Sequence, residues 1–271
     1  MTNQRTSYEA FCDDGYLVAN SILNMQEIAE VNRALALPIQ LLCENLGLPT
    51  PVEGDRDSLH DAMVSLKKHD QTAYLNAIKI SQNHHSVLGL PGKPKLIEAL
   101  KKAGLDEPVV SLKPFPIMVS EELHIEGGYN LRPLHQEWPV MQGSSDGVVC
   151  WIALHDVTAE HSALHLIPGS HKKGMRAYHR TKCGTGIVPE DLPPSDPIRL
   201  EVNAGDAVIF SCFMAHGSSP IGNKFRSAVT IRFNNLAAAD FIERGYPDPS
   251  RVEIDRQPEN MYTPVQIVRS R

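Results

Sequence analysis

Apolar residues recur at helical spacing along the amino-terminal part of the chain. Residues 7–47 predict a helical segment in which Asn24 caps a helix and Glu27, three residues on, reaches back to the cap. One face of this helix carries the apolar residues Ile28, Val31 and Leu35. Pro38 is expected to kink or end the helix, because proline lacks the backbone N–H that a helix interior uses. The segment is predicted to serve packing.

The helical pattern continues over residues 58–104. Ser58 and Asp61 have the spacing of a capping box. The apolar stripe that follows consists of Leu59, Met63 and Leu66. Pro94 and Gly104 bracket a later helix, with proline near its start and glycine just past its end, as is usual for helix termini. These segments predict a helical support for a core that is formed elsewhere.

Beyond Gly104 the helical period gives way to short apolar or alternating runs that Gly, Pro, Asn and Asp separate. The runs are Val109–Leu112, Pro116–Val119, Val148–Leu154, Leu164–Ile167, Ile198–Val202, Ala207–Phe210 and Ala228–Phe233. With a strand around His135 they make about eight strands, which is typical of a jelly roll or a related double sheet. Helices first and strands after predict an α+β fold with a mainly β, cupin-like core, buttressed by the amino-terminal helices.

The whole chain, residues 1–271, is interpreted as one domain. Residues 1–105 are its mainly helical support, residues 106–235 its jelly-roll core, and residues 236–271 a carboxy-terminal wrap along the surface. The connection from His171 to Pro197 is rich in Gly, Pro and charge. It is expected to be a polar loop at one mouth of the barrel, where lids usually lie.

Composition and charge narrow the function classes. Hydrophobic residues make up 42% of the chain and charged residues 21%, which are the values of a soluble globular protein. A formal net charge of -6 argues against a nucleic-acid partner, which needs a clustered basic face. No apolar run has the length of a membrane span and no signal segment opens the chain, so a cytoplasmic protein without a membrane partner is expected. The sequence assigns no oligomeric state.

The cysteines carry no metal or disulfide signature. They are Cys12, Cys43, Cys150, Cys183 and Cys212. They are widely spaced and form no C-x-x-C pair, so neither a disulfide framework nor a thiolate zinc site is indicated. Most are expected to be small buried apolar groups.

His135 and Glu137 are two residues apart, so a strand would present both side chains on one face. An open site for non-haem Fe(II) needs two histidines and one carboxylate, with the other positions left for water, cosubstrate and O2. The second histidine is predicted to be His216, which follows the strand-like run Ala207–Phe210. If Glu137 is not a ligand, Asp146 and Asp156 are the alternatives.

Other signals in the sequence are weaker. Gly143–Gly147 matches G-x-S-x-G, but a strand follows it where a nucleophile elbow needs a helix, so we reject it. His161 and His165 would be roughly 13 Å apart along a strand at ~3.3 Å per residue, so they are not expected to share an ion. His171 either faces the mouth of the site or lies in solvent.

Two further groups of residues each have two readings. Trp138 and Trp151 either wall the pocket or belong to the barrel core. Lys172, Lys173 and Arg176 either attract an anionic substrate or form a solvated basic loop.

Taken together in order, these motifs resemble the phytanoyl-CoA dioxygenase family between about Phe11 and Phe233. The matching segments are Arg132–Glu137, Trp151, Ala163–His171, Gly205–Phe210, His216–Ser218 and Phe225–Arg226. Members of this family are Fe(II)- and 2-oxoglutarate-dependent oxygenases built on a double-stranded β-helix.

The resemblance implies a role for each matching residue. His135, Glu137 and His216 would hold Fe(II), with 2-oxoglutarate and O2 as cosubstrates. Arg226 would bind the distal carboxylate of 2-oxoglutarate with help from the Ser218 hydroxyl, and Trp151 would belong to the same cofactor pocket. Arginine suits this task because its planar fork binds both carboxylate oxygens, which lysine cannot do. Arg232, in the same strand, is the reserve candidate.

Glu137 stands where the family usually has aspartate, so the carboxylate sits on an arm one methylene longer. Related halogenases replace this carboxylate with a small residue to admit chloride, so Glu137 favours hydroxylation. The sequence thus predicts an oxygenase that oxidises a small-molecule metabolite with release of succinate and CO2. The alternatives are a zinc-type isomerase or hydrolase at the same three residues, since His and carboxylate also suit zinc, and a cupin-like binding module without turnover.

Overall fold

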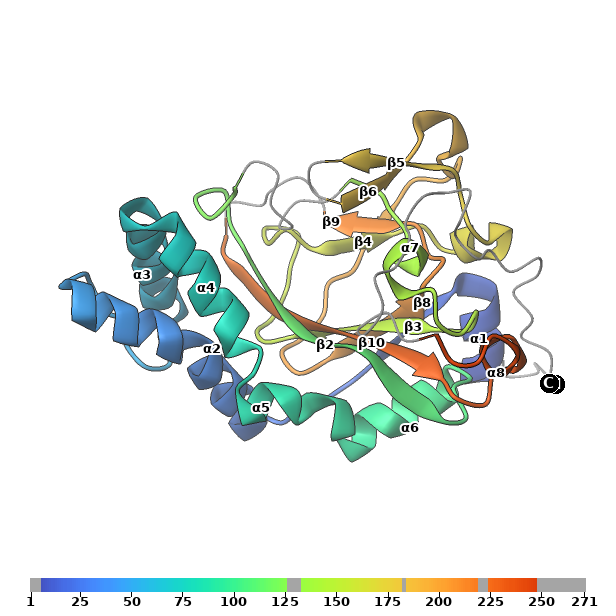
Figure 1. The fold of residues 1–271 in the computed structure, drawn as a ribbon, viewed down its shortest axis with the longest axis horizontal. Helices are drawn as coiled ribbons and strands as arrows, with labels where there is room; N and C mark the ends of the chain where they lie inside the picture. The colour runs from blue at the N-terminus through green and yellow to red at the C-terminus, as the bar shows by residue number, and fades with distance from the viewer. Residues whose placement is uncertain (1–5, 126–132, 182–183, 219–223, 248–271) are drawn as a thin grey trace.

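A computed structural model describes residues 6–125, 133–181, 184–218 and 224–247 of the chain. The amino-terminal part is helical, as predicted. Its helices are α1 (Ser7–Asp14), α2 (Met25–Leu46), α3 (Arg56–His69), α4 (Gln71–Ser81), α5 (His85–Leu88) and α6 (Pro94–Lys102), with a 3-10 turn η1 (Leu90–Gly92) before α6. Figure 1 shows α2, α3 and α4 gathered at one end of the molecule, with α5 and α6 alongside the sheet.

Helix α2 has the predicted start but not the predicted end. The side chain of Asn24 accepts from the backbone N–H of Glu27 at 2.9 Å, and the Glu27 carboxylate accepts from the N–H of Asn24 at 2.9 Å. Of the two outcomes expected at Pro38, an end of the helix is wrong, because α2 continues through it to Leu46 and is capped by Gly47, whose φ is 66°. Tertiary packing of the buried face offsets the ~3 kcal/mol that an interior proline costs. That face consists of Ile28, Val31, Ala34, Leu35, Ile39 and Cys43.

Helix α3 begins two residues earlier than Ser58. Asp55 is its cap and accepts from the N–H groups of Asp57 at 3.0 Å and Ser58 at 3.2 Å. The predicted capping box at Ser58 is therefore wrong, and the Ser58 hydroxyl instead accepts from the Val52 N–H at 2.8 Å. The later helix is confirmed, since α6 starts at Pro94 and Gly104 follows its end with a φ of 97°.

Within the described residues, the strands form two antiparallel sheets and a hairpin. The strands of the larger sheet, in spatial order, are β1 (Tyr16–Ala19), β8 (Ala207–Ser211), β3 (Val148–Ala153), β10 (Arg226–Asn235) and β2 (Pro108–Val119). The smaller sheet is β7 (Ile198–Arg199), β4 (Leu164–Leu166) and β9 (His216–Ser218), and β5 (Tyr178–Thr181) pairs with β6 (Gly184–Ile187). The two runs predicted over 109–119 are one strand, β2. The mixed helical and antiparallel fold is as expected.

Alternation along the central strands divides the core into two layers. In β3, Val148, Cys150 and Ile152 pack into the cluster that contains the helices. Val149 and Trp151 belong to a second cluster, which includes Leu164 and Leu166 of the smaller sheet. Successive residues of a strand point to opposite faces, so one face of the larger sheet meets the helices and the other meets the smaller sheet. The site lies on this second face.

The connection 171–197 is not simply a polar loop. It contains the β5–β6 hairpin and two 3-10 turns, η2 (Ser170–Lys173) and η3 (Pro189–Asp191). Both readings of His171 are wrong, since its side chain is buried and its Nε2 lies 3.0 Å from the backbone oxygen of Cys12. Lys172 pairs with Asp13 at 3.2 Å, and Lys173 and Arg176 both pair with Asp191. Each of these cations therefore has an acidic partner, although Lys173 and Arg176 share the single carboxylate of Asp191.

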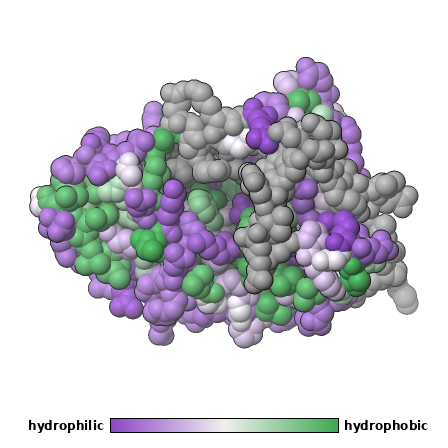
Figure 2. Space-filling view, in the orientation of Figure 1, coloured by the Kyte–Doolittle hydropathy of each residue, from purple (hydrophilic) through white to green (hydrophobic). Residues whose placement is uncertain are grey.

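The remaining features concern the cysteines and the surface. Cys43, Cys150 and Cys212 are buried, Cys12 is half-buried, and the four are free thiols, while Cys183 lies outside the described residues. Apolar side chains reach the surface over the helical end, where Leu41 of α2 and Ile80 of α4 are exposed (Figure 2). No helix among the described residues is long and apolar enough to cross a membrane. The last helix of the described residues is α8 (Ala239–Glu243), and the description stops at residue 247, so most of the predicted wrap lies outside it.

Candidate metal centre

His135 and His216 are joined by a single antiparallel β-bridge. The His135 N–H donates to the His216 carbonyl at 2.9 Å, and the His216 N–H donates to the His135 carbonyl at 3.0 Å. Their rings lie 4.2 Å apart between centroids, and both residues are 4% exposed. The predicted strand around His135 is thus only a bridge, and His216 opens β9.

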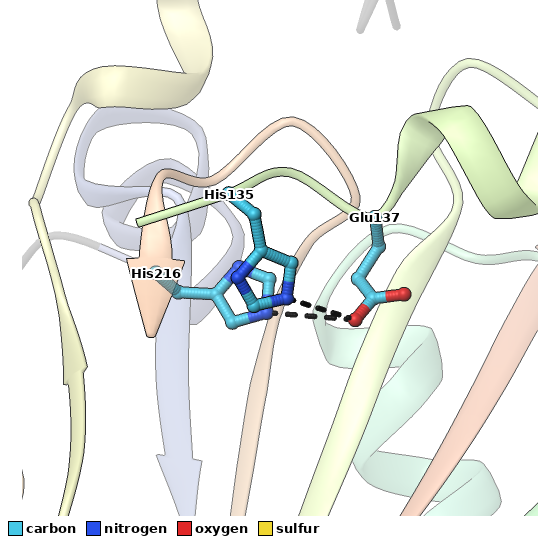
Figure 3. Close-up of side chains that lie close together, drawn as sticks. All are labelled: His135, Glu137 and His216. Atoms are coloured by element: carbon cyan, nitrogen blue, oxygen red, sulfur yellow. Dashed lines mark ion pairs between the residues drawn. The ribbon is translucent and has the colours of Figure 1, made fainter. Parts of the chain in front are cut away.

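Glu137 reaches the same point by a different route from the one predicted. It precedes the short helix α7 (Trp138–Met141) and has helical backbone angles, so the alternation of a strand does not apply. The N–H groups of Glu137 and Trp138 both donate to the Cys212 carbonyl, at 2.9 and 3.1 Å, which fixes this turn against the end of β8. The Glu137 side chain then extends toward the two imidazoles (Figure 3).

The three side chains converge with their donor atoms facing one another. Oε1 of Glu137 is 3.5 Å from Nε2 of His135 and 3.6 Å from Nε2 of His216. The ligand atoms all lie within 4.8 Å of one another, and all three residues are buried. Ligands about 2.1 Å from one ion at right angles would be roughly 3 Å apart, so a small contraction brings this set to a metal. Two imidazoles and one carboxylate are the donor set of an open non-haem iron site.

Backbone carbonyls fix the tautomer of both imidazoles. Nδ1 of His135 lies 2.8 Å from the Pro133 oxygen, and Nδ1 of His216 lies 2.9 Å from the Met214 oxygen. A carbonyl oxygen only accepts, so each neutral ring carries its hydrogen on Nδ1 and presents a lone pair on Nε2. Metal-binding histidines are held in this way in proteins, which supports the fit of these residues to a divalent ion.

Arg232 makes a two-point ion pair with Glu137. Its Nε donates to Oε2 at 2.8 Å and its Nη2 donates to Oε1 at 3.2 Å. The side chain comes from β10 and is 15% exposed. Its fork is therefore already engaged by a carboxylate of the chain, which weakens Arg232 as the reserve candidate for a dicarboxylate ligand.

A cavity of about 440 Å³ lies over these residues. One part of its wall is apolar and consists of Leu112, Phe115, Ile117, Val149, Leu164 and Phe210. His135, Glu137 and His216 line it, and so do Arg226, Ser218 and Trp151. The structure thus brings all six predicted site residues to one cavity. Trp138 is not among its lining residues and instead stacks on Phe213 at 4.8 Å in the core.

Arg226 is a buried cation without an acidic partner within the described part of the chain. It is 1% exposed, its Nη1 donates to the Ser162 carbonyl, and its Cζ lies 5.6 Å from the centre of the Trp151 ring. Its Nε has no hydrogen-bond partner there. Burial lowers the pKa of Arg226 to about 10, so the group stays cationic at neutral pH. A buried charge is costly unless it is paired, so this position suits an anion.

The other candidates serve the fold. Asp146 accepts from the Asn235 side chain at 2.7 Å, and Asp156 accepts from the Ala204 N–H at 2.8 Å. Among the described residues, His135, Glu137 and His216 are the one group of three or more side chains with metal-binding geometry, so His161 and His165 form no such group. The segment 143–147 is a turn that leads into strand β3, as its rejection as a nucleophile elbow required.

Sequence reasoning missed three polar residues of the cavity wall and the partner of Glu137. The three wall residues are Arg180, Thr185 and Thr230. The signal for Arg232 was present, since Arg226, Thr230 and Arg232 are separated by even numbers and share one face of β10. What the sequence did not reveal is that the two arginines meet different partners.

Comparison with known proteins supports one family. The profile described as Phytanoyl-CoA dioxygenase (PhyH) matches residues 11–228. Methylphosphonate hydroxylase of Gimesia maris is 29% identical over 126 residues, 46% of this chain and 46% of that protein. Peroxisomal phytanoyl-CoA dioxygenase of Mus musculus is 28% identical over 112 residues, 38% of this chain and 33% of that protein. The chain thus spans less than half the length of these curated relatives.

Solved structures share the fold at low sequence identity. The non-heme monooxygenase ThoJ in its apo form gives a TM-score of 0.58 at 16% identity, covering 84% of this chain and 77% of that one. The epimerase SnoN, in complex with Fe3+, alpha ketoglutarate and nogalamycin RO, gives a TM-score of 0.54 at 15% identity, covering 95% and 91%. These similarities concern the arrangement of helices and sheets.

Proposed function

Because this chain belongs to the phytanoyl-CoA dioxygenase family, we propose that it is an Fe(II)- and 2-oxoglutarate-dependent oxygenase. Its primary substrate is a small-molecule metabolite, which it hydroxylates while 2-oxoglutarate is converted to succinate and CO2. The single observation that carries this proposal is the shared cavity, which has an iron-type donor set at one place in its wall and, at another, a buried arginine with no acidic partner among the described residues.

In this proposal each chain group has a defined task. His135, Glu137 and His216 hold Fe(II), and when bound, the metal supplies the redox chemistry that couples O2 and 2-oxoglutarate to oxidation of a C–H bond. Arg226 binds the distal carboxylate of 2-oxoglutarate, with the Ser218 hydroxyl beside it. Trp151 holds the Arg226 guanidinium against its ring face, where a cation is favoured. The apolar wall excludes water and receives the part of the substrate that is to be oxidised.

The proposed architecture is a double-stranded β-helix, or jelly roll, in which the two antiparallel sheets face each other across the site. Support comes from the apolar cluster shared by the inner faces of both sheets and from the similarity in fold to SnoN. We further propose a single domain over 1–271, with helical support over 1–105, the jelly-roll core over 106–235 and a wrap over 236–271.

Two other functions use the same residues and are outcomes of the test. A zinc-dependent isomerase or hydrolase would need the three donors but not O2. A cupin-like binding module would hold a ligand without consuming 2-oxoglutarate. The uncompensated charge of Arg226 favours the oxygenase, because it gives an anionic cosubstrate a place to bind.

The experiment is an oxygen and succinate assay on the purified protein. The protein is loaded anaerobically with Fe(II), mixed with 2-oxoglutarate, and exposed to O2 with a panel of candidate metabolites. Succinate release that requires both Fe(II) and O2, and that a metabolite accelerates, supports the proposal. Turnover by Zn(II)-loaded protein without O2 contradicts it, as does ligand binding with no consumption of 2-oxoglutarate. Arg226→Ala is the matched control, since it keeps the three metal donors.

A further inference from the structure

The two oxygens of the Glu137 carboxylate have different surroundings. Oε1 faces both imidazoles, at 3.5 and 3.6 Å, and accepts a longer hydrogen bond of 3.2 Å from Nη2 of Arg232. Oε2 accepts the shorter bond, 2.8 Å, from Nε of Arg232. The side-chain exposure of Glu137 is 4%, so this pair is largely removed from water. Hydrogen bonds between charged groups are stronger than neutral ones, and the fork fixes direction as well as distance.

Arg232 contacts the Glu137 carboxylate, whereas Arg226 lies against the Trp151 ring in another part of the cavity. Both lie on the cavity face of β10, six residues apart, which is about 20 Å along a strand. The register between β10 and β2 shifts on either side of Arg232, where Thr230 opposes Phe115, Arg232 opposes Leu112 and Phe233 opposes Val110. The extra residues lie in β2, since β10 pairs regularly with β3 from Ala228 to Phe233, so Arg232 keeps the face that the alternation of β10 gives it. The strand thus gives each region of the cavity its own arginine.

The longer arm of glutamate creates a need for such a partner. A carboxylate binds metals through one oxygen or through both. An open facial site leaves three of its six positions to other ligands only if its carboxylate uses one oxygen. The extra methylene of Glu137 lets an unrestrained carboxylate rotate or chelate. A fork that retains Oε2 removes both freedoms.

We propose that Arg232 is a positioning residue that holds Glu137 as a one-oxygen metal ligand, with Oε1 offered to the metal and Oε2 retained by the guanidinium. This inference rests on the proposed metal centre and deepens it. It assigns to the second arginine of β10 the task of keeping positions open for 2-oxoglutarate and O2. A merely structural ion pair would stabilise the fold without affecting how many positions the metal keeps free.

The test counts exchangeable water molecules on bound Mn(II), a metal that suits carboxylate and water ligands. Proton relaxation of the Mn(II)-loaded protein gives this count without turnover. The chosen variant is Arg232→Lys, which keeps a positive charge beside buried Glu137 but loses the two-point fork. Wild type is expected to hold three waters, and Arg232→Lys fewer. Binding of 2-oxoglutarate to the Mn(II) form should weaken by about tenfold, the lower end of the cost of losing a partner that supports a metal ligand.

Two further variants make the result specific. Arg180→Lys is the matched control, because Arg180 lines the same cavity, is exposed and forms no ion pair within the described residues. It should keep three waters. In a Glu137→Gln background the Arg232→Lys change should have no further effect on the water count, because the two-point ion pair is already gone. Arg232→Gln is the second variant if the lysine protein does not fold, and it should lose waters in the same way.

The outcomes separate this inference from the proposed function. Three waters and unchanged 2-oxoglutarate affinity in Arg232→Lys would show that the pair is only structural and overturn the inference. A wild-type protein that binds Mn(II) but not 2-oxoglutarate overturns the proposed function, while the water counts still decide the role of Arg232. A wild-type protein that binds no divalent metal overturns both.

Discussion

His135 and His216 exchange two backbone hydrogen bonds, so one β-bridge sets the positions of both imidazoles. Their Nδ1 atoms meet the carbonyl oxygens of Pro133 and Met214, each two residues back in the chain. The two rings are thus oriented by identical local contacts, although they are eighty-one positions apart in the sequence. These backbone contacts therefore orient both rings so that each presents the lone pair of its Nε2 atom, the form in which histidine binds a metal ion.

We expect His135→Ala and His216→Ala each to abolish oxygenase activity and to weaken Fe(II) binding by at least about 100-fold. Loss of a group that merely supports a metal ligand already costs about 10–100-fold, and these changes remove the ligand itself. Binding should be measured by anaerobic titration, with circular dichroism as the check on the fold. His165→Ala is the control, since His165 is not one of the three clustered donors. Unchanged Fe(II) affinity in either alanine variant would contradict the assignment.

Arg226→Ala should raise the apparent KM for 2-oxoglutarate by roughly ten- to a hundredfold or more. The change removes a charge-assisted, two-point interaction worth on the order of 1.5–3 kcal/mol, at about 1.4 kcal/mol per tenfold. Arg226→Lys should recover little of the loss, because lysine has no fork. The measurement is succinate release against 2-oxoglutarate concentration. If Arg232→Ala raised the apparent KM for 2-oxoglutarate and Arg226→Ala did not, the roles of the two arginines would be reversed.

The substitutions of Glu137 should rank by charge. Glu137→Asp should keep measurable 2-oxoglutarate turnover, since the anion remains and only its reach shortens. Glu137→Gln should lose far more, because the charge that offsets the metal is gone and the pair with Arg232 is broken. Glu137→Ala should open a coordination position, with some decarboxylation recovered by added chloride or formate. Succinate release under saturating Fe(II) ranks the three; wild-type rates in both Glu137→Gln and Glu137→Ala would exclude Glu137 as a ligand.

Acid should destabilise the fold through His155. Burial lowers its pKa to about 4, an effect that the Nδ1 contact with the Asp156 carbonyl opposes and the nearby Arg56, His161 and Arg226 reinforce. The folded state therefore keeps the ring neutral, and its Nε2 accepts from the Ser227 N–H at 3.0 Å. As pH falls from about 6.5 toward 4, the His155 ring binds a proton in the unfolded chain but stays neutral in the folded chain. The free energy of unfolding therefore decreases over this range.

One histidine contributes a slope of at most about 1.4 kcal/mol per pH unit over this window. His155→Asn should flatten the acid side of the stability profile by up to that amount while leaving stability above pH 7 insensitive to pH at this site. Urea unfolding at a series of pH values measures it. An identical slope in wild type and variant would show that His155 does not titrate as its burial indicates.

Much of the site could be predicted because the types of its residues, and their order along the chain, indicate its chemistry. Two histidines, a carboxylate and an arginine in the last strand are recognisable wherever the fold places them. The helix cap at Asn24 and the glycine after α6 were also predictable, because capping depends on contacts within a few residues. Local patterns failed where packing decided, as at Pro38, which α2 passes through.

By itself, then, the sequence determined which residue types form the proposed donor set, His135, Glu137 and His216, and the alternation that turns Arg226 and Arg232 to one face of a strand. Only the tertiary structure decided that Glu137 reaches the histidines from the start of a helix, held by the Cys212 carbonyl, and that its carboxylate meets Arg232. The physical reason is that such pairings join segments some 75–95 positions apart in the chain. Periodicity predicts the face of a strand or helix on which a side chain lies. The residue that it contacts there depends on how distant segments of the chain pack.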